Sequence, residues 1–361
     1  MNSKEELKEI DEVLTRIRSE FEDYSHITPI NTNEEYELFV KKDCNYNPQL
    51  KYKEYNVKNK IEDLKKLKIE NDSEIGKLFC EIKDYLLSFA EQFDNIGTDK
   101  FHTEHLFEPI DEETLDKAKE TLDKEIEEVE ESEKEISSQE LGNKLRQELE
   151  KYGLNDWKIN YNKNASSTVN VNGGKKKITI RDETYFSESH VQKLIIHEIG
   201  THALRSENGR QQEYKIFSTG LPNYLSTEEG LASYNEEQQG VSNPHIIKRL
   251  ARNVLMTSVA SKGSFMDIYN SIRPYFEEDE EGDEKTFKMC VRIKRGLGDT
   301  KKPGGFLKDH AYFQGLCKIR KFVKEGGDLK KLYAGKIGIQ HLLLLEKGVL
   351  KNPKIIPAFL E

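Results

Sequence analysis

The stretch HEIGTH at residues 197–202 decides how the centre of this chain must fold. It places two imidazoles five residues apart, His197 and His202, with the carboxylate of Glu198 beside the first. On a regular α-helix an offset of five turns two side chains roughly 140° apart, against about 40° for an offset of four. A π-bulge adds one residue to a turn and would bring both rings to one side, and Gly200 makes this distortion easy. We therefore expect a locally widened helix at this stretch.

The same residue types predict a metal site. Two imidazoles and an adjacent carboxylate are the groups with which proteins hold zinc and activate a water. The alternative is two unrelated helix histidines, one in the core and one at the surface. A tetrahedral zinc site also needs a third protein ligand, commonly a carboxylate from a following helix. Glu228 and Glu229 both offer one, but consecutive helical residues point about 100° apart, so only one can face the metal. Both could also be ordinary first-turn acids of a helix.

The residues before the histidine stretch predict a small antiparallel sheet that leads into a buried helix. Residues 157–161 alternate in the manner of a half-buried strand. Residues 168–171 and 177–180 flank an Asn-Gly-Gly turn, which indicates a hairpin. Ser187 or Ser189 can cap the helix that follows. In zinc peptidases this order places an edge strand beside the metal, where it binds the substrate backbone.

Helical patterns dominate elsewhere, so we expect an α+β fold that is mostly helical. Apolar residues recur at helical spacing over residues 7–17 and again over 75–89, which predicts two packing helices. Residues 111–135, rich in Glu and Lys, predict a long solvated helix or a helical arm. We divide the chain into a helical N-terminal region, 1–145, and a catalytic domain, 146–361, although the two could form one continuous unit.

Several short motifs, spread from about residue 46 to the end, carry a resemblance to a known family. They are residues 46–52, the HEIGTH stretch, Asn208-Gly209, Glu229-Gly230-Leu231-Ala232, Arg295-Gly296, residues 305–309, Tyr312 and Gly315. In these motifs the chain resembles the microtubule-associated tyrosine carboxypeptidase family and its bacterial relatives, which are named for a Gln-Glu-Gly-Leu-Ala motif.

The resemblance implies a zinc carboxypeptidase. Its ligands would be His197, His202 and Glu229, the residue directly before Gly-Leu-Ala, and Glu198 would be the general base. This resolves the choice between Glu228 and Glu229. The bacterial motif has Gln where this chain has Glu228, a departure that suits the eukaryotic members of the family.

An enzyme that acts at C-termini must bind a free carboxylate, and the fork of an arginine meets both of its oxygens. Arg205 lies three residues after His202 on the same helical face, although a structural salt bridge explains it equally well. Arg295 and Lys308 rank higher, on the resemblance alone. Tyr312 is the first candidate to donate to the developing oxyanion, because a phenol does not compete for the metal. Its alternative role is core packing on an amphipathic helix.

Composition limits the partners. The net charge of -10, with 34% charged residues against 35% hydrophobic ones, indicates a heavily solvated surface. The short basic clusters lack interleaved aromatics, which disfavours nucleic acid, and no apolar run is long enough to cross a membrane. Four scattered cysteines suit a reducing compartment, so we expect a cytoplasmic protein.

The function that we predict is removal of a C-terminal residue, tyrosine being one candidate, from a peptide or protein tail such as the acidic tail of tubulin. A zinc endopeptidase or aminopeptidase without the carboxylate clamp is one alternative. The other is a non-catalytic helical binding protein whose metal is structural.

Overall fold

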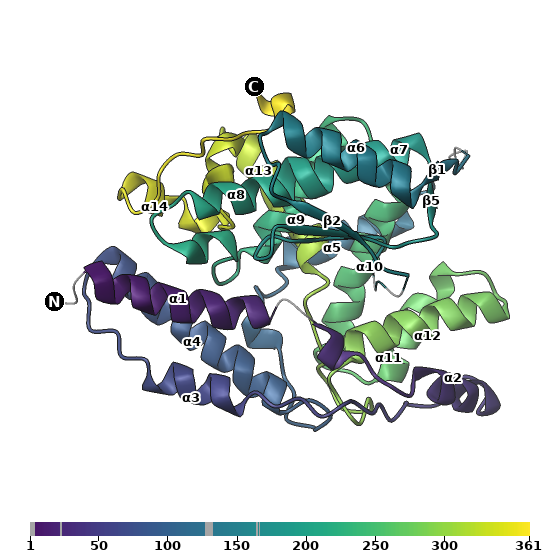
Figure 1. Cartoon of the computed structure of the whole chain (residues 1–361). Helices are drawn as coiled ribbons and strands as arrows, with labels where there is room; N and C mark the ends of the chain where they lie inside the picture. The colour runs from purple at the N-terminus through teal and green to yellow at the C-terminus, as the bar shows by residue number, and fades with distance from the viewer. Residues whose placement is uncertain (1–3, 22–23, 127–132, 164, 166) are drawn as a thin grey trace.

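Helices make up most of the molecule, and a small sheet lies near its centre (Figure 1). The computed structural model describes residues 4–21, 24–126, 133–163, 165 and 167–361. The predicted α+β, mostly helical fold class is confirmed. Within the described residues no helix combines the length and the apolar character that a bilayer crossing requires.

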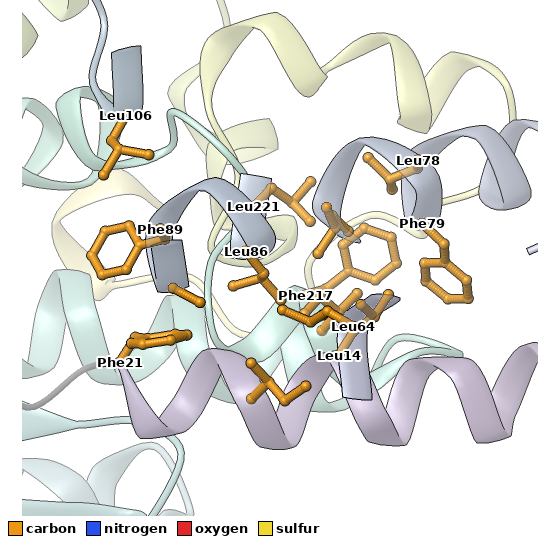
Figure 2. Packing of buried hydrophobic residues seen from close by; sticks show 14 of the residues in the cluster. Leu14, Phe21, Leu64, Leu78, Phe79, Leu86, Phe89, Leu106, Phe217 and Leu221 are labelled. Atoms are coloured by element: carbon orange, nitrogen blue, oxygen red, sulfur yellow. The ribbon is translucent and has the colours of Figure 1, made fainter. Parts of the chain in front are cut away.

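The N-terminal helices lie below the sheet in Figure 1 and build one large apolar cluster. Two of them, α1 (Lys4–Glu20) and α4 (Glu74–Asp94), are the helices that the apolar periodicity predicts. α4 packs against both α1 and α3 (Lys58–Lys66). Figure 2 shows Phe21, directly after α1, opposite Phe89 of α4, with ring centroids 5.2 Å apart. α2 (Thr32–Lys41) lies apart from these three and contacts a later helix, α12 (Glu280–Lys294).

The apolar cluster of the N-terminal helices also contains residues from the second half of the chain. Phe217 and Leu221, which Figure 2 shows beside α4, are buried within it. Both lie between α8 (Leu204–Arg210) and α9 (Leu225–Gln238), two helices that flank the candidate site. The N-terminal helices therefore pack against the segment that joins these helices.

The acidic run at residues 111–135 does not form the long helix that its composition predicts. In the described residues the helix, α5 (Glu112–Asp123), ends before the extended Lys124. Residues 127–132 lie outside the described part. α5 buries Ala118 and Leu122 against Leu250 and Val254 of α10 (Pro244–Ala260). Those few apolar residues therefore anchor a short packed helix, while the charged residues cover its outer face.

The central sheet contains the predicted hairpin. β3 (Val169–Asn172) pairs antiparallel with β4 (Lys177–Ile180), and the strand order is β2-β4-β3. β2 (Lys158–Tyr161) runs parallel to β4, so this sheet is mixed and not purely antiparallel as expected. Alternation along one strand carries no information about the direction of its partner. A separate two-stranded antiparallel pair joins β1 (Ile136–Ser137) to β5 (Tyr185–Phe186).

The other α-helices of the described residues are α6 (Ser138–Lys151), α7 (Glu188–Leu194), α11 (Phe265–Ile272), α13 (Ala311–Lys324) and α14 (Leu343–Glu346). In Figure 1, α6 lies above the central sheet. α9 and α13 pack closely together, and α10 packs against α11 and α13.

Candidate functional site

The histidine stretch lies in a widened helix, as its spacing predicts. A π-helix, η3 (Ile195–Ala203), continues α7 and leads directly into α8. The backbone N–H of Leu204 bonds to the carbonyl of Ile199, five residues back. The rings of His197 and His202 consequently lie together, with centroids 4.7 Å apart and planes at 81°.

Three side chains converge at this point. The Nε2 atoms of His197 and His202 each lie 3.7 Å from Oε2 of Glu229, which α9 carries. One ligand atom from each residue lies within 4.8 Å of the other two. Ligand atoms of a tetrahedral zinc ion, with bonds of about 2.0 to 2.2 Å, lie about 3.3 Å apart. The separations and the N, N, O donor set therefore fit a zinc ion after small adjustments of the side chains.

Each histidine ring forms a hydrogen bond through Nδ1 with a different carboxylate. Nδ1 of His197 lies 2.6 Å from Oε1 of Glu236, and Nδ1 of His202 lies 2.7 Å from Oε1 of Glu228. Such bonds orient the ring and leave Nε2 as the nitrogen that faces the centre. The motifs in the sequence did not predict a role for Glu236. Its position could have predicted this role, because Glu236 lies seven residues after Glu229, two turns further along the same face of a helix.

Negative charge is concentrated around the two rings. Burial alone would lower the pKa of His197, but the hydrogen bond with Glu236 and the charges of Glu198 and Glu229 raise it to about 9. Glu198 is 8% exposed, and burial raises the pKa of its carboxyl. A cation would relieve this accumulation of carboxylates.

Arg205 lies inside the protein, behind the site. Its side chain is 0% exposed. Its guanidinium donates to the carbonyls of Leu332 and Ile337 and forms an ion pair with Glu228. Burial alone would raise the pKa of Glu228, but Arg205, Lys336 and His202 outweigh burial and hold it well below its usual range. Of the two roles weighed for Arg205, the geometry favours the structural ion pair over binding of substrate.

Tyr312 reaches the site because two helices touch at glycines. A Cβ atom on Gly230 of α9 would lie 2.1 Å from the backbone carbon of Gly315 on α13, so neither residue can be larger without a shift. This contact brings Tyr312 of α13 close to Glu229. The charge of Glu229, followed by burial, raises the pKa of Tyr312 well above its usual range. The phenol therefore keeps its proton and can donate it in a hydrogen bond.

A cluster of cations adjoins Tyr312. Asp309 is fully buried and forms an ion pair with Arg292. Nη2 of Arg295 lies 3.9 Å from Oδ1 of Asp309. The Nε atom of Arg295 is buried, and it has no hydrogen-bond partner among the residues that the structure describes. Nζ of Lys308 lies 4.3 Å from the ring centroid of Tyr24. Burial lowers the pKa of Lys308 to about 8, against the opposing charges of Asp309 and Glu229. The three cations thus outnumber the two carboxylates that act on Lys308, Asp309 and Glu229, and the excess positive charge can attract an anionic group.

A family model matches most of this chain, and individual known proteins match about half of it. A family model described as microtubule-associated tyrosine carboxypeptidase matches residues 37–361. The Mus musculus protein named "Putative tyrosine carboxypeptidase MATCAP2" is 31% identical over 201 residues, which cover 54% of this chain and 37% of that protein. The Homo sapiens microtubule-associated tyrosine carboxypeptidase 1 is 29% identical over 177 residues, covering 47% and 36%. The matched regions thus span less than two fifths of these relatives. Since the family model matches residues 37–361, a span that includes α3, α4 and the histidine site, the chain belongs to the microtubule-associated tyrosine carboxypeptidase family.

Proposed function

We propose that this chain is a zinc-dependent carboxypeptidase that removes a C-terminal residue from peptide or protein tails. One observation carries the proposal: His197, His202 and Glu229 converge within 4.8 Å, next to Glu198 and to a cluster of cations. The family description supports the carboxypeptidase reaction, and the donor set supports the metal.

His197, His202 and Glu229 would hold the zinc ion. When bound there, zinc would supply an activated water and polarise the scissile carbonyl. Glu198 takes a proton from the attacking water and passes it to the leaving amine. Its raised pKa suits this exchange, because the carboxyl can hold the proton between the two steps. Tyr312 donates a hydrogen bond to the oxygen on which negative charge develops.

Lys308 and Arg295 bind the free carboxylate of the substrate. Lys308 lies over the ring of Tyr24, and Arg295 is 3.9 Å from Asp309, whereas Arg292 makes a closer ion pair with Asp309. A substrate carboxylate would balance the positive charge of this cluster, because unpaired charge away from water is costly. This binding distinguishes a carboxypeptidase from an endopeptidase with the same metal centre. β3 is an edge strand that packs against η3, and it offers backbone groups to an extended peptide.

The substrate that we propose is a peptide or protein tail, with tyrosine as a candidate terminal residue. The relatives are named tyrosine carboxypeptidases, so a tubulin-like acidic tail is the first one to test. We also propose a cytoplasmic location, because all four cysteines are free thiols.

A peptide library tests the reaction. Peptides with free or amidated C-termini are incubated with the purified chain, and the products are read by mass. Loss of single residues from free C-termini alone supports the proposal. Equal cleavage of both sets would instead indicate an endopeptidase or aminopeptidase. A chain that binds no zinc and cleaves none of the peptides would favour the non-catalytic binding protein.

A further inference from the structure

The carbonyl of Gly200 lies near the point where the widened helix returns to a regular α-helix. In η3 the N–H of Leu204 bonds five residues back, to Ile199. α8 then resumes the spacing of four. A buried carbonyl needs a hydrogen-bond donor, and a donor from elsewhere in the chain can stabilise the widened form at this change of register.

Tyr333 supplies that donor. Its hydroxyl donates to the Gly200 carbonyl at 2.8 Å, and its side chain is 0% exposed. Tyr333 lies in the 3-10 helix η6 (Leu329–Ala334), 133 residues further along the chain. The widened turn is therefore stabilised by a contact distant in sequence.

Asn235 joins this contact to the helix that carries Glu229. Its amide donates to the Tyr333 hydroxyl and to Oγ1 of Thr201, both at 3.0 Å. The Thr201 hydroxyl in turn donates to the carbonyl of Ile196 at 3.1 Å. The Asn235 amide thus starts two series of hydrogen bonds that end at carbonyls of the widened turn. One passes through the Tyr333 hydroxyl and the other through the Thr201 hydroxyl, and each hydroxyl both accepts and donates.

We infer that Asn235 and Tyr333 are positioning residues that hold residues 197–202 in the widened form, so that both histidines face Glu229. Their hydrogen bonds go to each other, to Thr201 and to the carbonyl of Gly200, so they act on the histidines through the backbone of the widened turn. The inference rests on the proposed function only in so far as the centre that it positions is a metal site.

The first test measures the turn itself, without metal. Tyr333→Phe removes only the hydroxyl, and hydrogen exchange of peptides that cover residues 195–204 reports on the helical bonds. We expect faster exchange there than in the wild-type chain. The matched control is Tyr52→Phe, which also removes a hydroxyl with two backbone partners, Leu297 and Gly296, away from the histidine helix. The control should leave exchange at residues 195–204 unchanged.

The second test measures zinc affinity by competition with a chromophoric chelator. Tyr333→Phe and Asn235→Ala should each weaken zinc binding about 10-fold or more, in the range found for residues that support metal ligands. The control Tyr52→Phe should bind as the wild-type chain does. Thr201→Val should weaken binding, whereas Thr201→Ser, which keeps the hydroxyl, should restore it. Cobalt absorption spectra of the same variants report ligand geometry without any activity assay.

The outcomes separate the two proposals. If exchange at residues 195–204 and zinc affinity both match those of the wild-type chain in Tyr333→Phe, the inference is overturned and the proposed function stands. If the wild-type chain binds no zinc, the proposed function fails, and the exchange measurement alone decides the inference. If Tyr333→Phe unfolds, the Thr201→Val and Thr201→Ser pair takes its place.

Discussion

In the proposed reaction, Glu198 takes the proton of the attacking water. Glu198→Gln keeps the size of the side chain and removes its ability to take a proton. We expect kcat to fall by about 10²-fold or more, while the zinc content of the purified chain stays the same. His202→Ala, in contrast, should lose both zinc and activity. A Glu198→Gln chain that cleaves peptides at the wild-type rate would contradict the assigned role.

The pKa of Lys308 predicts how peptide cleavage depends on pH. Burial lowers its pKa to about 8, so the side chain is charged below that pH and neutral above it. We expect kcat/KM for a peptide with a free C-terminus to fall as the pH rises through about 8, because the neutral amine no longer attracts the carboxylate. Rates measured from pH 6 to 10 test this.

Lys308→Arg is the control for this dependence. An arginine keeps its charge throughout this range, so the fall in kcat/KM should move to higher pH. An unchanged alkaline fall in Lys308→Arg would assign it to another group and remove Lys308 from the site.

At the scale of elements, the contact between α9 and α13 positions Tyr312 beside Glu229. Gly230→Ala would place a Cβ atom 2.1 Å from the backbone of Gly315, so the two helices must separate. We expect a loss of about 1 to 3 kcal/mol in the free energy of unfolding, as overpacked cores show, together with reduced kcat. Denaturant unfolding and peptide cleavage measure the two effects.

Gly200→Ala is the comparison for that prediction. Its Cβ would lie 3.0 Å from Cε1 of Phe359, the edge of a side chain that can move. Gly200→Ala should therefore cost less stability than Gly230→Ala. The reverse order would mean that the contact between the helices is looser than the structure shows.

At the scale of the molecule, one apolar cluster spans the proposed boundary between residues 1–145 and 146–361. It contains Phe79 of α4 together with Phe217 and Leu221. Phe79→Ala should cost about 3 to 5 kcal/mol and shift the unfolding of the histidine site as well. We expect a single calorimetric transition that moves as a whole. Two transitions, of which the substitution moves only one, would instead support two independent domains.

The features that the sequence determined by itself are local. The spacing of five in HEIGTH demanded a widened turn, and the structure has a π-helix there. Apolar periodicity predicted α1 and α4, and Asn-Gly-Gly predicted the β3–β4 hairpin. These predictions succeed because they depend on the geometry of a few consecutive residues.

Only the tertiary structure decided which groups meet over long distances in sequence. It pairs Arg205 with Glu228, places Glu236 behind His197 and brings Tyr333 to Gly200. It also runs β2 parallel to β4 and ends α5 early against α10. The physical reason is common to all of these: the partner of a buried polar group or of a strand is set by how whole elements pack, and residue types along the chain do not encode that packing locally.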